Sequence, residues 1–122
     1  MIRLVSFSYR DGGIPVARAV TDCRKLANPH RVAGLRQLTG LDQAVQDYVF
    51  ADPEAARLLN QLRHQVTVGQ IEPDATIAFG CVGGRHRSVA MAERFALRLC
   101  LAGIPATIEH LALRPADHEM DH

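Results

Sequence analysis

Hydrophobic and polar positions alternate at the start of the chain and predict a strand there. Residues 2–8 place apolar and polar side chains in turn, and a cluster of turn residues follows at 9–13; a period of two is typical of a half-buried strand. Residues 16–23 indicate a second, less regular strand, because alanine is a weak strand former. Residues 24–41 have no sustained period and predict a long ordered loop, and loops of this length in a compact domain commonly carry function.

The rest of the pattern alternates helices with short apolar runs. Asp52 is suited to cap a helix whose first residue is Pro53, and Gly103 is suited to end another helix. The predicted elements are helices at 42–50 and 52–66, a strand at 75–80, a helix at 85–101 and a strand at 106–111. A strand, a long helix and a strand in succession form a βαβ unit. The sequence therefore predicts an α/β fold with a small, mainly parallel sheet flanked by helices.

Length and composition indicate one domain. The 122 residues include 48% hydrophobic and 22% charged residues, and the net charge is +1. This balance supports a single core, and it excludes a charge-rich disordered chain and a uniformly basic nucleic-acid coat. We expect the domain to span residues 1–113 and to be followed by a polar, acidic tail at 114–122.

Cysteine and histidine usage argues against disulfide and metal sites. Cys23, Cys81 and Cys100 are odd in number and form no C-x-x-C pair, which argues against a disulfide framework or a zinc knuckle. The histidines are far apart in sequence or lie in the tail, so we expect no metal. No apolar run approaches the roughly 18 residues that span a bilayer, and the first residues lack the pattern of a signal peptide. We expect a cytoplasmic protein without membrane contact.

Charge is arranged in blocks along the chain. Residues 1–40 carry a net charge of +5, residues 41–75 carry −4, residues 76–103 carry +3 and residues 104–122 carry −3. If the two basic blocks converge on one face, they focus a positive potential on an anionic ligand; otherwise both are solvated faces. Thirteen of the fourteen basic residues are arginine, which suits bidentate phosphate contacts, although an arginine-rich genome would give the same count.

The most informative stretch lies between the predicted strand at 75–80 and the predicted helix at 85–101. It reads Gly80-Cys81-Val82-Gly83-Gly84-Arg85-His86-Arg87-Ser88. The paired glycines allow the backbone N–H groups to point inward, the helix N-terminus adds a positive dipole, and Arg87 can contact two phosphate oxygens. These features favour an anion-binding loop. The alternative is a tight turn whose glycines only permit packing, with Arg85 and Arg87 in solvent.

The same stretch fits the pattern C-x5-R-S, formed by Cys81, Arg87 and Ser88. In cysteine-dependent phosphatases this spacing lets a thiolate attack phosphorus while the arginine holds the oxygens and the hydroxyl helps the thiolate to leave. A phosphatase also needs a general acid, and the sequence offers three candidates without ranking them: Asp11, Asp22 and Asp42. In the other interpretation, Cys81 is a small apolar residue at the end of a buried strand.

Four motifs occur in order along nearly the whole chain, over roughly residues 3–113. They are Val5-Ser6-Phe7-Ser8 with Gly12-Gly13, Asp22-x-Arg24-x-Leu26-x-Asn28-Pro29-His30, Leu35-Arg36-x-x-Thr39-Gly40-Leu41-Asp42, and Gly80-Cys81-x-Gly83-Gly84-x-His86-Arg87-Ser88-Val89. Together they resemble the C-terminal domain of the RNase adapter protein RapZ family.

The resemblance implies a fold similar to the sugar-phosphate-binding part of phosphofructokinases and a non-catalytic adapter without a cofactor. Such an adapter senses glucosamine 6-phosphate or another phosphosugar, binds a small regulatory RNA, self-associates as a homo-oligomer and contacts an RNase or another protein. The implied ligand pocket is lined by His30, Gly83, Gly84, Arg85, His86, Arg87 and Ser88. The implied RNA contacts are Arg24, Lys25, Arg31 and Arg36. His30 as a purely structural histidine remains the alternative.

Three departures from the family limit what the resemblance implies. No G-x-x-x-x-G-K-[ST] occurs in the sequence, so we expect a stand-alone domain that lacks the P-loop half and does not hydrolyse ATP or GTP. Val82 stands where the family usually has threonine, which removes a possible ligand hydroxyl. The end of the chain, 114–122, is acidic where RapZ proteins can be basic, which acts against RNA binding.

Overall fold

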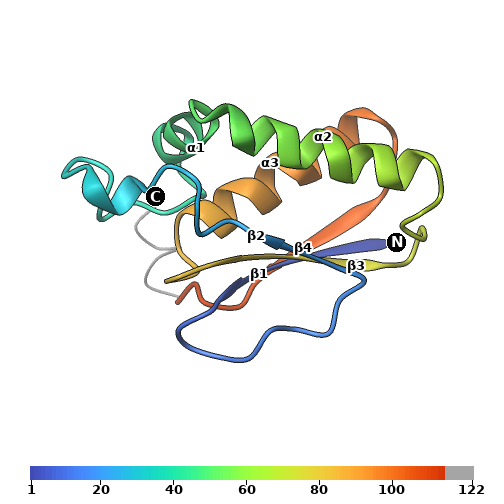
Figure 1. Cartoon of the computed structure of the whole chain (residues 1–122), viewed down its shortest axis with the longest axis horizontal. Coiled ribbons are helices and arrows are strands. Elements are labelled where there is room, and N and C mark those ends of the chain that lie inside the picture. Colours follow the sequence, from blue (N-terminus) through green and yellow to red (C-terminus); the bar gives the residue numbers. More distant parts are fainter. Residues whose placement is uncertain (115–122) are drawn as a thin grey trace.

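Residues 1–114 form two layers in the computed structural model, a four-stranded sheet and three α-helices on one of its faces (Figure 1). The structure describes these residues only, so the predicted acidic tail lies outside it except for Arg114. The elements are β1 (Ile2–Ser8), β2 (Ala19–Asp22), the 3-10 helix η1 (Pro29–Arg31), α1 (Gln43–Phe50), α2 (Pro53–Thr67), β3 (Thr76–Cys81), α3 (Arg87–Leu101) and β4 (Ala106–His110). The strand order is β2-β3-β1-β4 and each pair is parallel. The predicted α/β class is confirmed.

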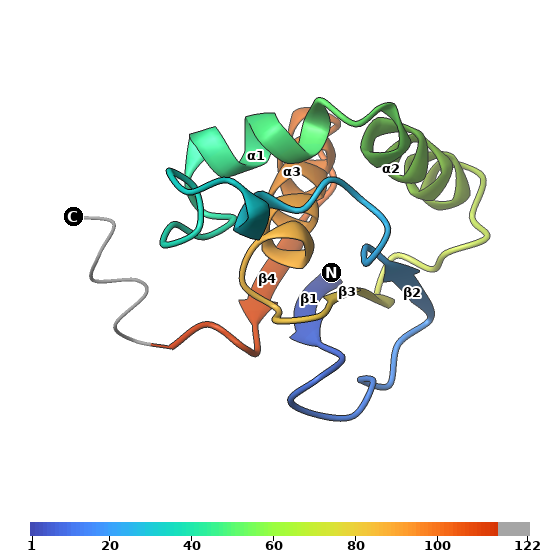
Figure 2. The same cartoon turned by 60° about the vertical axis from the view of Figure 1, so that its left-hand side comes forward.

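The connections between the strands run over both faces of the sheet. Segment 9–18 joins β1 to β2 across the face opposite the helices, as Figure 1 and Figure 2 show. The path from β2 to β3 runs through η1, α1 and α2, and α3 joins β3 to β4. The chain therefore leaves the neighbouring strands β1 and β3 toward opposite faces of the sheet. In open α/β sheets, ligands bind beyond the carboxyl ends of the strands at such a switch point.

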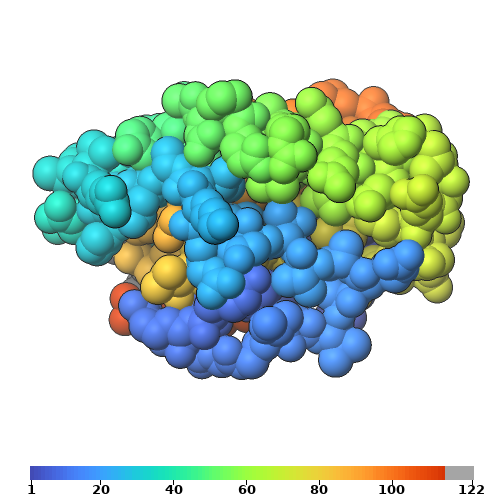
Figure 3. Space-filling view, in the orientation of Figure 1, coloured from blue at the N-terminus to red at the C-terminus, as the bar shows by residue number. Residues whose placement is uncertain are grey.

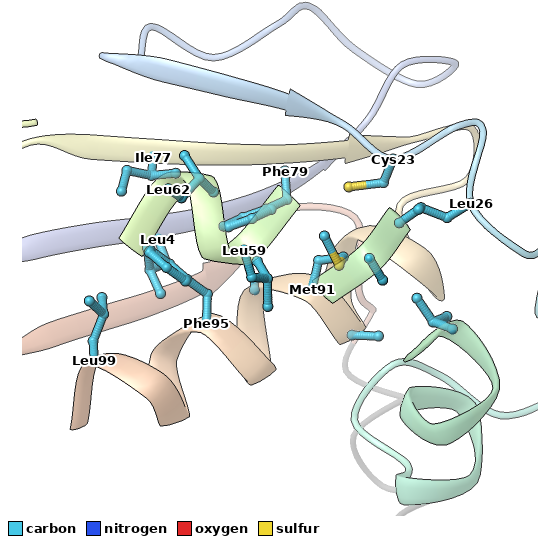
Figure 4. Close-up of a cluster of buried hydrophobic side chains, with 14 of the residues drawn as sticks. Leu4, Cys23, Leu26, Leu59, Leu62, Ile77, Phe79, Met91, Phe95 and Leu99 are labelled. Carbon is cyan, nitrogen blue, oxygen red and sulfur yellow. The ribbon is translucent and has the colours of Figure 1, made fainter. Parts of the chain in front are cut away.

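The core lies between the sheet and the helices (Figure 4). Leu4 on β1 and Ile77 and Phe79 on β3 point toward the helices and are fully buried. From the apolar side of α3 come Phe95 and Leu99, and the ring centroids of Phe79 and Phe95 lie 6.1 Å apart. Burying side chains of this size contributes about 1.5–3 kcal/mol each. This packing fixes α3 against β1 and β3, whose carboxyl ends carry the candidate site.

A side-chain cap begins α2 as the sequence predicts. Asp52 accepts a hydrogen bond from the N–H of Glu54 at 3.0 Å, and Pro53 is the first residue of α2. Asp42 precedes α1 but makes no side-chain cap bond to that helix. Its carboxylate accepts the N–H of Thr39 at 2.9 Å instead, so it holds the end of the long loop.

The long loop is confirmed with one addition, the single turn η1, while several element boundaries differ from the prediction. β2 begins at Ala19 rather than at 16, because the chain first crosses beneath the sheet. The helix α3 begins at Arg87 rather than at 85. Arg85 and His86 stay in the turn, where the carbonyl of Arg85 accepts the N–H of Gly40 at 2.8 Å. The strands β3 and β4 differ from the prediction by one residue at their ends.

The cysteines and helices of residues 1–114 bear on disulfide pairing and on membrane spanning. Cys23 and Cys81 are buried, Cys100 is exposed, and all three are free thiols. None of the described helices combines the length and apolar character needed to cross a bilayer.

Candidate anion-binding site

A pocket of about 260 Å³ lies beyond the carboxyl ends of β1 and β3. Its walls come from the turn between β3 and α3, from the loop after β2 and from the residues that follow β1. The lining residues are Arg10, Asn28, His30, Cys81, Val82, Gly83, Arg85, His86 and Arg87. Figure 3 shows the turn after β3 reaching the surface between the loop after β2 and the segment after β1. The pocket therefore lies where open α/β sheets bind ligands.

The lining of this pocket is basic. Three arginines and two histidines contribute to it, and no carboxylate among the described residues does. The helix α3 begins at this edge, and the N-terminus of a helix carries a positive partial charge. Arg10 belongs to the first basic block of the sequence and pairs with Asp11 at 3.0 Å, and Arg85 and Arg87 belong to the second block. The two blocks therefore converge here, and the resulting potential favours an anion.

Gly83 and Gly84 shape the turn in different ways. Gly84 has a φ of +69°, and a Cβ there would lie 2.6 Å from the Cβ of Ala112 and 3.0 Å from the Cβ of Ser8. Gly83 lines the pocket, and a Cβ there would meet only Nη2 of Arg10, at 3.8 Å. Within residues 1–114, neither glycine N–H donates to a backbone acceptor. Gly84 is thus required for packing, while Gly83 leaves room for a ligand.

Arg87 links the pocket to the loop after β2. It is 7% exposed, and its Nη1 donates to the carbonyl oxygens of Arg24 at 2.6 Å and Leu26 at 3.3 Å. These carbonyls belong to a segment more than sixty positions earlier in the chain. A phosphate contact has to use the remainder of the guanidinium, and the predicted bidentate contact stays a prediction.

Two histidines lie close together in the pocket, with ring centroids 6.3 Å apart. His86 is 8% exposed, and its Nε2 is buried without a hydrogen-bond partner in the described structure. Burial lowers the pKa of His86, the nearby backbone groups of Leu38 and Arg36 act in the opposite direction, and the positive charge of Arg85 lowers it further. His30 is exposed, and its backbone N–H donates to Oδ1 of Asn28 at 3.1 Å. Buried polar atoms are normally paired, so the unpartnered Nε2 of His86 is unusual.

The thiol of Cys81 is packed against Ser88 at the base of the pocket. Cys81 is 2% exposed and Ser88 is fully buried, with Sγ and Oγ 3.2 Å apart, and the N–H of Ser88 donates to Sγ at 3.4 Å. None of the three acids that the sequence offered lines the pocket: Asp11, Asp22 and Asp42. Within residues 1–114, Sγ of Cys81 forms its hydrogen bonds with Ser88 and with none of these carboxylates. This geometry favours Cys81 as a small buried residue.

The four residues predicted to contact RNA are all exposed on the loop after β2: Arg24, Lys25, Arg31 and Arg36. Arg24 pairs with Asp22 at 2.7 Å. Lys25 and Arg31 have no ion-pair partner among residues 1–114. Their exposure permits contact with a large anion, and RNA binding stays a prediction.

The structure brings together most of the predicted ligand residues but separates two of them. Ser88 and Gly84 are buried beside the pocket and do not line it. Sequence reasoning missed Arg10, whose position just after β1 was the available signal, because parallel strands end at a common edge. Asn28, which also lines the pocket, appeared in the sequence only as part of a family motif. In the described part of the chain, no group of three His, Cys, Asp or Glu side chains could hold a metal ion.

Comparisons with known proteins agree with the fold and the motif order. The family model described as the RapZ C-terminal domain matches residues 1–114. Relatives named nucleotide-binding proteins include those of Thermobifida fusca, 47% identical over 114 residues, Streptomyces griseus, 45% over 114, and Frankia casuarinae, 43% over 113. Each match covers 88% of this chain but only 38%, 34% and 39% of the respective relative. The chain thus spans less than two fifths of the length of these relatives, and it belongs to the RapZ C-terminal domain family.

Proposed function

We propose that this domain is a non-catalytic binding module that senses a phosphorylated sugar. The observation that carries the proposal is the pocket itself, which is basic, free of lining carboxylates within residues 1–114, and located at the start of α3. An anion bound there would interact with the start of α3 and with Arg85 and Arg87. Membership of the RapZ C-terminal domain family supports a sugar phosphate, with glucosamine 6-phosphate as the first ligand to test.

Calorimetric titration of the full chain tests this proposal. Glucosamine 6-phosphate should bind, and glucosamine without phosphate should not. Because the relatives are named nucleotide-binding proteins, AMP provides a comparison ligand with the same phosphate group. Arg87→Ala should weaken sugar-phosphate binding roughly 30- to 1000-fold, since a charge-assisted contact in a partly dry pocket contributes on the order of 2–4 kcal/mol.

A glycine substitution separates loss of the pocket from loss of the fold. Gly83→Val places a side chain in the pocket, where the structure leaves space for it, and it should weaken binding at least about tenfold by excluding the ligand. Gly34→Val adds the same side chain at another open position, in the loop after β2 and away from the lining residues, and it should bind normally. The proposal fails if Gly83→Val binds as well as Gly34→Val, or if glucosamine binds as tightly as its phosphate.

The exposed cations of the loop after β2 favour a second role, RNA binding. A few arginine contacts give weak, salt-dependent binding for one domain, and an oligomer that presents several such surfaces binds more strongly. Replacement of Arg24, Arg31 and Arg36 by alanine should therefore reduce affinity and the salt dependence of binding. A chain ending at Leu113 should bind at least as well as the full chain, because the removed segment is acidic. Loss of binding on truncation, or an unchanged triple variant, would contradict this role.

Contact with an RNase or another protein, and self-association, complete the proposed adapter function. Family membership supports both. Sedimentation of the full chain across a range of concentrations measures self-association directly, and a monomer at all concentrations would contradict that part.

A further inference from the structure

A second pocket, of about 550 Å³, adjoins the anion pocket. Both pockets are lined by Asn28, Val82 and Arg87, so the two form one depression with Arg87 between its halves. The second half is lined on its other side by residues of the basic loop, which include Lys25 and Arg31.

The second pocket contains both paired and unpaired cations, and Arg24 pairs with Asp22 at 2.7 Å. Lys25 and Arg31 have no ion-pair partner within residues 1–114. Asp52 is the lining carboxylate of the described residues. Its two oxygens accept the backbone N–H groups of Glu54 at 3.0 Å and Ala27 at 3.2 Å, so it caps α2 and fastens the loop. The unpaired cations therefore remain available to an anion inside a concave surface.

Arg87 connects the two halves physically. Its Nη1 is fixed by the carbonyls of Arg24 and Leu26, which lie at the second pocket, while the side chain also lines the first. A ligand that occupies only the first pocket interacts with one of two adjacent basic surfaces. A ligand with a second anionic group interacts with both.

We propose that the ligand carries two phosphates and is a sugar bisphosphate, with one phosphate in each pocket. The inference rests on the proposed function, because the first phosphate occupies the pocket described there. Lys25 and Arg31 hold the second phosphate, and Arg87 lies between the two. Since the same loop is proposed to contact RNA, the bisphosphate competes with RNA for these cations.

Calorimetry with glucose 6-phosphate and glucose 1,6-bisphosphate tests the proposal on the full chain. The bisphosphate should bind the wild type at least about tenfold more tightly, because added charge-assisted hydrogen bonds strengthen binding by this order. In Lys25→Gln/Arg31→Gln this preference should fall to about twofold or less, with the affinity for the monophosphate nearly unchanged.

A matched variant controls for net charge alone. Arg57→Gln/Arg63→Gln removes the same two charges from α2, where neither residue lines a pocket described above, and it should keep the wild-type preference. Equal affinity of the wild type for the two ligands overturns the bisphosphate inference and leaves the anion site standing. An equal loss of preference in both double variants also overturns it, because the effect is then long-range charge. Failure of both ligands and of glucosamine 6-phosphate to bind overturns the proposed function as well.

Discussion

Replacement of Arg87 by alanine tests how the basic loop is held against the pocket. The substitution removes the donor of two hydrogen bonds, to the carbonyls of Arg24 at 2.6 Å and Leu26 at 3.3 Å. A hydrogen bond to a charged group contributes about 1.5–3 kcal/mol, and the longer contact contributes about 0.5–1 kcal/mol. The variant should therefore lose about 2–4 kcal/mol of unfolding free energy, a large fraction of the stability of a small domain.

Urea unfolding measures this loss, and limited proteolysis locates it. Without Arg87, trypsin should cleave faster after Lys25 and Arg31, because the loop that carries them is no longer tied to α3. Arg57→Ala is the control: it removes an exposed arginine that pairs with Glu54, and such a pair contributes less than about 1 kcal/mol. If Arg87→Ala matches the control in both urea midpoint and cleavage rate, the guanidinium does not hold the loop and the reasoning is refuted.

Three further predictions concern the turn, its histidine and its thiol. Gly84→Ala should cost about 1–3 kcal/mol of stability, because its φ is +69° and a Cβ meets Ala112, whereas Gly83→Ala should leave the urea midpoint unchanged; equal midpoints would contradict this. Burial lowers the pKa of His86 in the folded state. The stability that neutral His86 contributes is therefore fully present above the unfolded pKa of about 6.5, and it declines as the pH falls below that value. The urea midpoint should then fall less on acidification in His86→Gln than in wild type, and an identical pH profile would refute the assignment. Finally, we expect no hydrolysis of an aryl phosphate; steady turnover lost in Cys81→Ser and kept in Cys100→Ser would establish the phosphatase alternative.

The periodic pattern was sufficient to predict the elements and the parallel sheet. The apolar side of α3 is buried against the sheet, so local sequence and tertiary structure agree there. β1 is buried on both faces from Leu4 to Ser8, so its alternating polar residues do not mark a solvent-facing side. The predicted ends of helices and strands were less accurate where contacts with distant segments determine them. The start of α3 at Arg87 depends on the contact between Arg85 and Gly40. The residues around Arg85 give no sign of this contact in the sequence.

The sequence pattern placed the candidate residues of the turn together but could not give the contacts between distant segments. Sequence chemistry placed Arg85, His86 and Arg87 at one loop, and the fold makes them line one pocket. The sequence could not show that Arg87 also donates hydrogen bonds to carbonyls of the loop after β2, because that contact depends on where the loop lies in the fold. Gly84 was assigned to the ligand, whereas its neighbours in space show that it allows β1 and the segment after β4 to pack closely.

The central claim is that an anion binds at the turn between β3 and α3, and glycine amide signals test it most directly. The chain contains nine glycines, which report on both ends of the sheet in a ¹⁵N–¹H correlation spectrum. During titration with glucosamine 6-phosphate, the amides of Gly83 and Gly84 should show the largest saturable shifts. Gly69 and Gly103, which follow the C-terminal ends of α2 and α3 at the far edge, should not move. Saturable shifts centred on Gly69 or Gly103, with Gly83 and Gly84 unchanged, would contradict the account.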